Sequence, residues 1–291
     1  MNWQAVRVDT NSEAVEVVCD LLISVGADGV QIDETNGISV IAYYENNDQL
    51  ANILSTIQSR LKLLLKVSVD PSPATINLSD VSQSDWENNW KKYYHTQRIT
   101  RHLTVVPSWE TFEPQQSDEM PIIMDPQLTF GTGTHETTRL MMQSLETVVR
   151  GGESMIDVGT GSGVLAVAAK LLGVSSVLAT DIDDISVKVA KENLMLNPIA
   201  ADIKVVTSDL LLNVETQPVD LIVANILADV IERLIPQTRS RLKPKGYFLV
   251  SGIYDAIAPH IEEQLRTNGY DIIQKSQMGK WHSYITQIKE K

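Results

Sequence analysis

One segment near the middle of the chain constrains its fold more than any other: residues 155–183, with the sequence MIDVGTGSGVLAVAAKLLGVSSVLATDID. A short apolar run is followed by a glycine-rich turn, a run of small residues, a second apolar run and a group of acids. This order predicts a buried strand, a tight loop, a helix and a second, parallel strand. Glycines in the turn let the backbone bend sharply and approach a ligand closely. The segment therefore predicts half of a ligand-binding α/β unit.

The spacing of these glycines narrows the class of ligand. The dinucleotide fingerprint G-x-G-x-x-G, counted from Gly159, requires a glycine where the chain has Val164. Asp157 precedes the turn, where a carboxylate repels a phosphate but attracts a cationic group. Asp181 ends the second predicted strand, where an acid accepts hydrogen bonds from ribose hydroxyls. A pyrophosphate is therefore disfavoured, whereas S-adenosylmethionine (SAM), which has a sulfonium, an ammonium and no phosphate, fits the segment.

The same residues resemble the D-x-G-x-G-x-G pattern of class I methyltransferases. This resemblance implies cofactor contacts from the acids and glycines of the turn, which are Asp157, Gly159, Gly161, Gly163 and Asp181. Asp209 follows the third predicted strand, where this class often places a group near the adenine; a plain surface acid is an equally good interpretation. A glycine-rich turn in an α/β domain without a cofactor is the alternative for the whole pattern.

Composition limits the cellular setting and the kind of partner. The chain of 291 residues is 43% hydrophobic and 21% charged, which is typical of a globular protein. It has one cysteine, no signal-like N-terminus and no apolar run of about 18 residues, so we expect a cytoplasmic protein without membrane contact. The formal charge of −13 argues against direct nucleic-acid binding and favours a basic partner. Acidity that serves solubility alone is an equal alternative.

The pattern of apolar residues divides the chain into two domains. Residues 1–80 follow the order β-α-β-β-α-β of a small ferredoxin-like α+β domain, with its last strand at 67–70. Residues 72–84 are polar and contain prolines, which is typical of a linker, and an aromatic stripe predicts a linker helix within 81–96. The remaining residues, 97–291, predict a Rossmann-like doubly wound sheet that ends in an antiparallel hairpin.

Two further segments carry candidate functional residues. TFGTGTHETTR, at 129–139, precedes a predicted helix, and its hydroxyls and glycine backbone can cap that helix and line a pocket; a glycine turn with an N-cap is the alternative. The apolar strand at 219–225 delivers Asn225 to the carboxyl edge of the sheet, where open α/β sheets bind ligands. Amide- and amine-directed methyltransferases often have Asn/Asp-Pro-Pro-Tyr there, whereas this chain has Asn-Ile-Leu-Ala.

Several segments together resemble the family of ribosomal protein L-eleven methyltransferases (PrmA) nearly end to end. They are the acidic domain of residues 1–80 and the motifs DWENNWKKYYH, FGTGTHETT, DVGTGSG and ANILA. The resemblance implies SAM-dependent trimethylation of lysine side chains and of the N-terminal α-amino group of one large-subunit ribosomal protein, docked by the N-terminal domain. It implies SAM contacts at Thr138, Gly159, Asp181 and Asn225, and we expect His135 and Asn225 at the catalytic centre, without a metal. Glu136 replaces the proline usual in the family.

Other functions stay open at this point. The main enzymatic alternative is a class I methyltransferase that acts on another protein or on a small molecule, and the acidity of the chain makes an RNA substrate less favoured. A SAM-binding module without catalysis is the alternative from another class, and the intact Asn225 and glycine turn argue against it.

Overall fold

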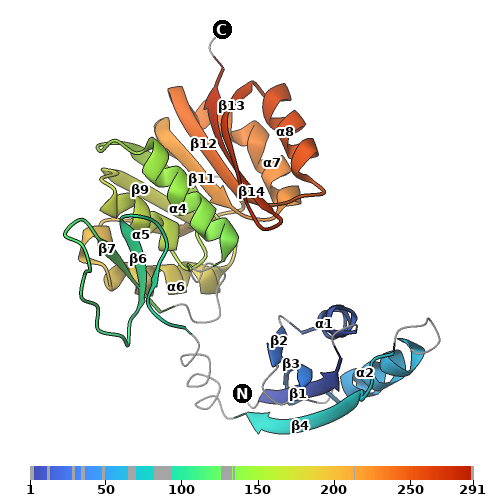
Figure 1. The fold of residues 1–291 in the computed structure, drawn as a ribbon. Helices are drawn as coiled ribbons and strands as arrows, with labels where there is room; N and C mark the ends of the chain where they lie inside the picture. The colour runs from blue at the N-terminus through green and yellow to red at the C-terminus, as the bar shows by residue number, and fades with distance from the viewer. Residues whose placement is uncertain are drawn as a thin grey trace. The chain divides into compact units, whose positions relative to one another are not determined.

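The computed structural model describes residues 3–11, 14–27, 30–33, 37–47, 50–64, 70–81, 94–125, 133, 135–212 and 214–289. The chain divides into two compact units, 1–94 and 95–291, and each is described by itself (Figure 1).

The first unit is a four-stranded antiparallel sheet with two helices. Its strand order is β2-β3-β1-β4, as expected for the split β-α-β-β-α-β unit. Its elements in chain order are β1 (Trp3–Thr10), α1 (Val15–Ser24), β2 (Val30–Asp33), β3 (Ile38–Glu45), α2 (Leu50–Leu64) and β4 (Thr75–Val81). An apolar core of strand and helix residues, including Val6, Val8, Leu22 and Ile57, holds these elements together.

The fourth strand differs from the sequence prediction. We expected a strand at 67–70 and a linker at 72–84, but β4 lies within that supposed linker and pairs with β1 from Trp3–Val81 to Asp9–Thr75. Backbone pairing at a sheet edge does not need apolar side chains, which is why composition alone predicted a linker here. Residues 67–69 and 82–93, which carry the rest of the predicted strand and most of the aromatic helix, lie outside the described residues.

The second unit contains a seven-stranded sheet with the order β10-β9-β8-β11-β12-β14-β13. The first five strands in that order are parallel, and β14 runs antiparallel to both of its neighbours. The strands are β8 (Ser154–Val158), β9 (Ser176–Asp181), β10 (Lys204–Thr207), β11 (Val219–Asn225), β12 (Leu242–Tyr254), β13 (Tyr270–Met278) and β14 (Trp281–Ile288). This confirms the predicted doubly wound sheet with a terminal hairpin and gives the unit the class I methyltransferase fold.

Helices cover both faces of this sheet. The helices are α4 (Glu136–Val148), α5 (Val164–Leu171), α6 (Asp184–Met195), α7 (Ala228–Thr238) and α8 (Ala258–Thr267), and two 3-10 turns span Pro198–Ala200 and Arg239–Arg241. Helices α7 and α8 share one apolar core with β11 and β12, while α4 crosses the opposite face in contact with α5 (Figure 1). Residues 164–169 of α5 are all buried because this helix lies between the main sheet and a small second sheet.

The second sheet has three strands, β5 (Gln97–Arg98), β6 (Leu103–Pro107) and β7 (Met120–Met124), in the order β5-β6-β7. Strands β6 and β7 are parallel, and the apolar side chains of β6, among them Leu103 and Val105, are fully buried. This sheet covers α5, which follows the glycine-rich turn, and therefore shields that part of the unit from solvent.

Candidate functional site

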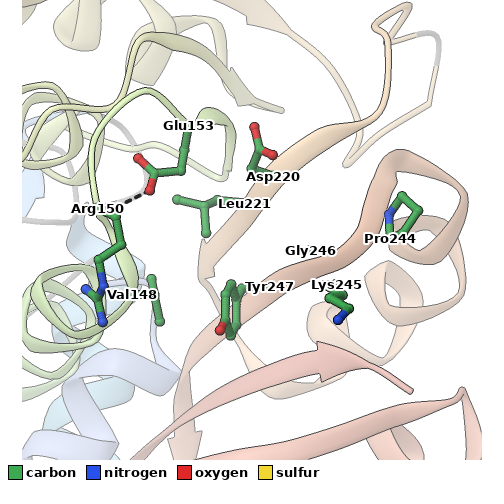
Figure 2. Close-up of a pocket in the computed structure, with 9 residues that line it drawn as sticks. All are labelled: Val148, Arg150, Glu153, Asp220, Leu221, Pro244, Lys245, Gly246 and Tyr247. Carbon is green, nitrogen blue, oxygen red and sulfur yellow. Dashed lines mark hydrogen bonds between the residues drawn. The ribbon is translucent and has the colours of Figure 1, made fainter. Parts of the chain in front are cut away.

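One pocket of the described residues lies away from the predicted site. Its volume is about 240 Å³, and it opens where β11 and β12 begin, beside Asp220, Gly246 and Tyr247 (Figure 2). Asp220 accepts a hydrogen bond from Lys243 Nζ at 2.8 Å, and Glu153 accepts one from the backbone amide of Arg150 at 2.6 Å. The predicted site residues instead follow the carboxyl ends of the strands, so this pocket belongs to the opposite edge of the sheet.

The glycine-rich turn joins β8 to α5 in a conformation that requires glycine. Gly159, Gly161 and Gly163 have φ angles of 70°, 54° and 84°, which side chains rarely adopt. A Cβ atom on Gly159 would lie 2.3 Å from the side chain of Ile226, the residue that follows β11. The amide of Gly159 donates to the carbonyl of Thr180 at 2.8 Å. The turn is therefore closely packed against the ends of two neighbouring strands.

Asp157 lies beneath this turn and is fully buried. Its Oδ2 accepts a hydrogen bond from the Thr160 hydroxyl at 2.7 Å, whereas Oδ1 has no partner among the described residues. Burial, reinforced by the negative charge of Asp181, raises the pKa of the Asp157 carboxyl to about 7, although the bond from Thr160 opposes the shift. We expected Asp157 at the mouth of the turn; the structure places it directly below.

Asp181 ends β9 and fastens the turn from the side. Its two carboxylate oxygens accept hydrogen bonds from the amides of Gly161 at 2.9 Å and Asp183 at 3.1 Å. Each oxygen keeps further acceptor capacity, so the carboxylate can still receive ligand hydroxyls. The next residue, Ile182, was not singled out from the sequence, yet its side chain is 67% exposed beside this acid.

Asp209 follows β10 and is already paired. Both of its carboxylate oxygens lie within 3.0 Å of Nη2 of Arg233 on α7. Its predicted place near an adenine stays a prediction.

Asn225 ends β11 between β8 and β12 and is 8% exposed. Its Nδ2 donates to the hydroxyl of Thr138 at 3.3 Å, which joins two predicted site residues 87 positions apart. Its Oδ1 is buried and has no partner among the described residues. Because a buried acceptor without a partner is costly, this oxygen marks a position where a donor from a ligand is expected.

His135 caps the helix that carries Thr138. Its Nδ1 accepts a hydrogen bond from the backbone amide of Thr137 at 3.3 Å and lies 2.9 Å from the Thr137 hydroxyl. Glu136 is the first residue of α4, a position that suits a proline and an acid alike, so the departure from the family residue leaves the start of the helix intact. Gly131, Thr132 and Thr134 of the same segment lie outside the described residues.

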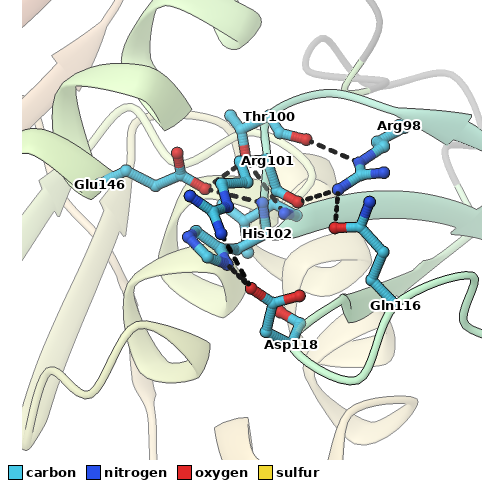
Figure 3. Close-up of polar contacts among 8 residues, drawn as sticks. Arg98, Thr100, Arg101, His102, Gln116, Asp118 and Glu146 are labelled. Carbon is cyan, nitrogen blue, oxygen red and sulfur yellow. Dashed lines mark hydrogen bonds and ion pairs between the residues drawn. The ribbon is translucent and has the colours of Figure 1, made fainter.

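The other end of α4 is anchored to the three-stranded sheet (Figure 3). Glu146 accepts hydrogen bonds from the hydroxyl of Thr100 and from the amide of His102 at 3.2 Å. His102 in turn lies 3.3 Å from a carboxylate oxygen of Asp118. These contacts hold the helix at one end while His135 and Thr138 at its other end reach Asn225 and the carboxyl edge of the main sheet.

The described part of the chain contains no group of three or more His, Cys, Asp or Glu residues placed to hold a metal ion. Within the same residues, no helix has the length and apolar character needed to cross a membrane. At the carboxyl edge, Asp181 ends β9 and Asp183 caps α6, while Asp209 is paired with Arg233. The carboxylates of Asp181 and Asp183 disfavour a phosphate and suit a cationic ligand.

Comparisons with known proteins agree with this geometry. The family model described as ribosomal protein L11 methyltransferase (PrmA) matches residues 2–289. The ribosomal protein L11 methyltransferase of Leuconostoc citreum is 67% identical over 291 residues, all of both chains, and that of Lacticaseibacillus paracasei is 44% identical over 99% of each. A crystal structure of ribosomal protein L11 methylase from Lactobacillus delbrueckii, 43% identical, covers 68% of this chain and 100% of its own, with a TM-score of 0.65. The chain belongs to the ribosomal protein L11 methyltransferase family.

Proposed function

We propose that this protein transfers methyl groups from SAM to amine nitrogens of ribosomal protein L11, namely lysine side chains and the N-terminal α-amino group, and carries each to the trimethylated state. The names of its full-length relatives support L11 as the substrate. A ribosomal protein as the substrate implies a cytoplasmic enzyme. Such a substrate is also basic, and a basic partner suits a chain with a net charge of −13.

The observation that carries the amine specificity is the unpartnered Oδ1 of Asn225. An amine nucleophile brings N–H donors, and one of them satisfies this buried acceptor. The hydrogen bond from Asn225 Nδ2 to Thr138 fixes the amide so that Oδ1 faces away from the helix. A substrate without an N–H donor would leave Oδ1 unsatisfied, which disfavours it.

The residues at the carboxyl edge fit SAM by their chemistry. Asp181 keeps acceptor capacity for ribose hydroxyls, and Ile182 exposes an apolar surface beside it for the adenine. The negative charge of Asp181 favours a cationic ligand over a phosphate. When bound, SAM supplies an electrophilic methyl group on a sulfonium.

The protein's part in the reaction is mainly to present a neutral, aligned amine. A lysine with a pKa near 10.4 is only about 0.1% neutral at pH 7.4. Desolvation at the site lowers that pKa, and Asn225 Oδ1 accepts one N–H so that the lone pair faces the methyl carbon. In the transfer the amine nitrogen would take the place of the sulfur on the methyl carbon, the sulfur would leave as a neutral thioether, and the methylated nitrogen would lose a proton to water before the next transfer. No strong base is required, so His135 contributes by capping α4 and shaping the site.

Intact-mass measurement tests this proposal. Recombinant L11 from the same source, incubated with the enzyme and SAM, should gain mass in steps of one methyl, and peptide mapping should place the methyls on lysines and on the N-terminus. Methylation confined to other residue types, or none on L11 while another protein or a small molecule is methylated, would contradict it. An enzyme that binds SAM but methylates nothing would point to a binding module.

A further inference from the structure

Three aromatic side chains meet at the carboxyl edge of the second unit, and none belongs to the glycine pattern. The rings of His135 and Trp281 have centroids 5.3 Å apart and meet edge to face at 68°. The rings of Tyr254 and Trp281 are 5.6 Å apart at 80°. They come from the cap of α4, the end of β12 and the start of β14, and Tyr254 pairs directly with Trp281 in the sheet. We call these three residues the aromatic wall.

Two routes through the chain connect the aromatic wall to Asn225. His135 lies one helical turn before Thr138, whose hydroxyl is bonded to the Asn225 amide. Asn225 also pairs with Ser251 in the neighbouring strand, three residues before Tyr254. The wall therefore stands at the same edge of the sheet as the unpartnered oxygen of Asn225.

Part of the wall is exposed to solvent. Tyr254 is 40% exposed, and two large apolar neighbours at the same edge, Leu227 after β11 and Ile257 after β12, are 66% and 44% exposed. Apolar side chains that follow neighbouring strand ends and are exposed within the described part of the chain indicate a binding surface. An ammonium already fits here, because Lys280 Nζ lies 5.8 Å from the centroid of the Tyr254 ring.

Hydrogen bonds hold in place the strand ends that carry the aromatic wall. The ring of His282, next to Trp281, is hydrogen-bonded to Asp255, next to Tyr254. Asp255 also accepts a bond from Gln277 at 3.1 Å, and the Ser251 hydroxyl donates to the carbonyl of His282 at 2.9 Å. A surface held in this way loses little conformational freedom when it binds a ligand.

We propose that the aromatic wall binds the partly and fully methylated ammonium group of the substrate and so sets how many methyl groups are added before release. This inference rests on the proposed function, in that the methylated atom is an amine nitrogen. Each methyl removes one N–H, so the hydrogen bond to Asn225 is lost as methylation proceeds. Attraction between a methylated ammonium and an aromatic ring does not need an N–H, so the wall keeps its hold when Asn225 no longer can.

Stepwise kinetics test this. In Trp281→Leu the rate of the third methyl transfer, relative to that of the first, should fall at least tenfold, so that mono- and dimethylated L11 accumulate in the intact-mass spectrum. Trp281→Phe keeps a ring and should restore most of the ratio. Tyr247→Leu, at the other end of β12, is the matched control and should leave the ratio unchanged. An unchanged ratio in both Trp281→Leu and Tyr254→Leu overturns the proposal.

A binding measurement that needs no turnover separates this inference from the proposed function. With ¹⁵N-tryptophan labelling and S-adenosylhomocysteine present, the indole N–H signal of Trp281, assigned through Trp281→Phe, should shift saturably with Nα-acetyl-trimethyllysine amide. A neutral analogue with carbon in place of the charged nitrogen should shift it far less, and the Trp109 signal should not move. Equal shifts with both compounds would overturn the proposal that the aromatic wall binds the methylated ammonium group. Selective shifts without amine methylation of L11 would support that proposal and refute the proposed function.

Discussion

At the scale of single residues, the buried carboxyl group of Asp157 links the stability of the protein to pH. Its pKa is about 7 in the folded chain, against about 3.9 for an unperturbed aspartate. Between these values the folded state binds more protons than the unfolded state, so stability falls as pH rises. The contribution of Asp157 to folding is therefore most favourable below about pH 4 and is lost as the pH rises to about 7.

The variant Asp157→Asn tests this pH dependence of stability, because an amide side chain is uncharged at every pH in the experiment. The free energy of unfolding of the original protein, minus that of the variant, should decrease from pH 5 to pH 8 in urea titrations without ligand. Asp209→Asn, at an exposed carboxyl paired with Arg233, is the control and should shift stability by the same amount at each pH. Parallel curves for Asp157→Asn would show that this carboxyl is ionised well below neutral pH.

Asn225 is expected to act on the amine and much less on the cofactor. Asn225→Ala should keep the Kd for SAM within a few-fold and lower kcat at least a hundredfold, because it removes the acceptor that aligns the nucleophile. Thr138→Val, which leaves the Asn225 amide in place but loses its partner, should have a smaller effect in the same direction. Calorimetry gives the Kd and single-turnover kinetics give the rate. If neither changes in Asn225→Ala, the active centre lies elsewhere.

At the scale of elements, helix α6 ties the glycine turn to the second sheet. Asn193, which is 1% exposed, donates from Nδ2 to the carbonyl of Ser162 at 2.9 Å and accepts the amide of Asp125 at 2.8 Å. One turn later, Asn197 bonds both the amide and the carbonyl of Ile123, in the manner of a strand partner. Asn193 of α6 thus holds the turn in place, and Asn197, just after the helix, closes the open edge of β7.

Asn193→Ala should disturb both sides of this link. It leaves the buried carbonyl of Ser162 and the half-buried amide of Asp125 without their partner, which costs about 2–4 kcal/mol of stability in total. Because the turn then loses its support, the Kd for SAM should also rise several-fold, although Asn193 lies outside the predicted cofactor contacts. The control is Asn268→Ala, which removes a helix-end hydrogen bond to Gln264 on α8 and should leave the Kd unchanged. An unaltered Kd in a folded Asn193→Ala protein would rule out this role.

The sequence predicted elements well where their physics is local. The order of strands and helices from β8 to β14 follows apolar periodicity and glycine turns, and the structure confirms it. The prediction was wrong at β4, because this strand pairs with β1, which lies about 70 positions earlier in the chain. The aromatic wall was missed for the same reason, since Trp281 and Tyr254 meet only through the register of the hairpin. The position of Asn225 at the end of a strand was predicted because a single segment of the sequence is enough to locate that end.

At the scale of the whole molecule, charge is unevenly divided between the two units. The first 80 residues have 11 acidic and 4 basic residues, a net charge of −7, whereas the remaining 211 carry −6. We expect the acidic first unit to attract the proposed basic substrate before close contact, an attraction that is screened over about 10 Å at roughly 0.1 M salt. Raising the salt concentration should therefore lower kcat/KM for L11 while the Kd for SAM stays nearly constant.

Removal of the first unit provides the strongest test of how the two units divide the work. The second unit has its own apolar core and contains every predicted cofactor residue, so a chain that starts at Ser84 should fold and bind SAM with nearly the original Kd. It should lose most of its activity on intact L11, because binding energy far from the reacting amine is what presents that amine to the methyl group. Short lysine peptides, which lack the rest of L11, should be methylated equally slowly by both proteins. A shortened enzyme that modifies L11 at the full rate would show that the first unit serves stability and not recognition.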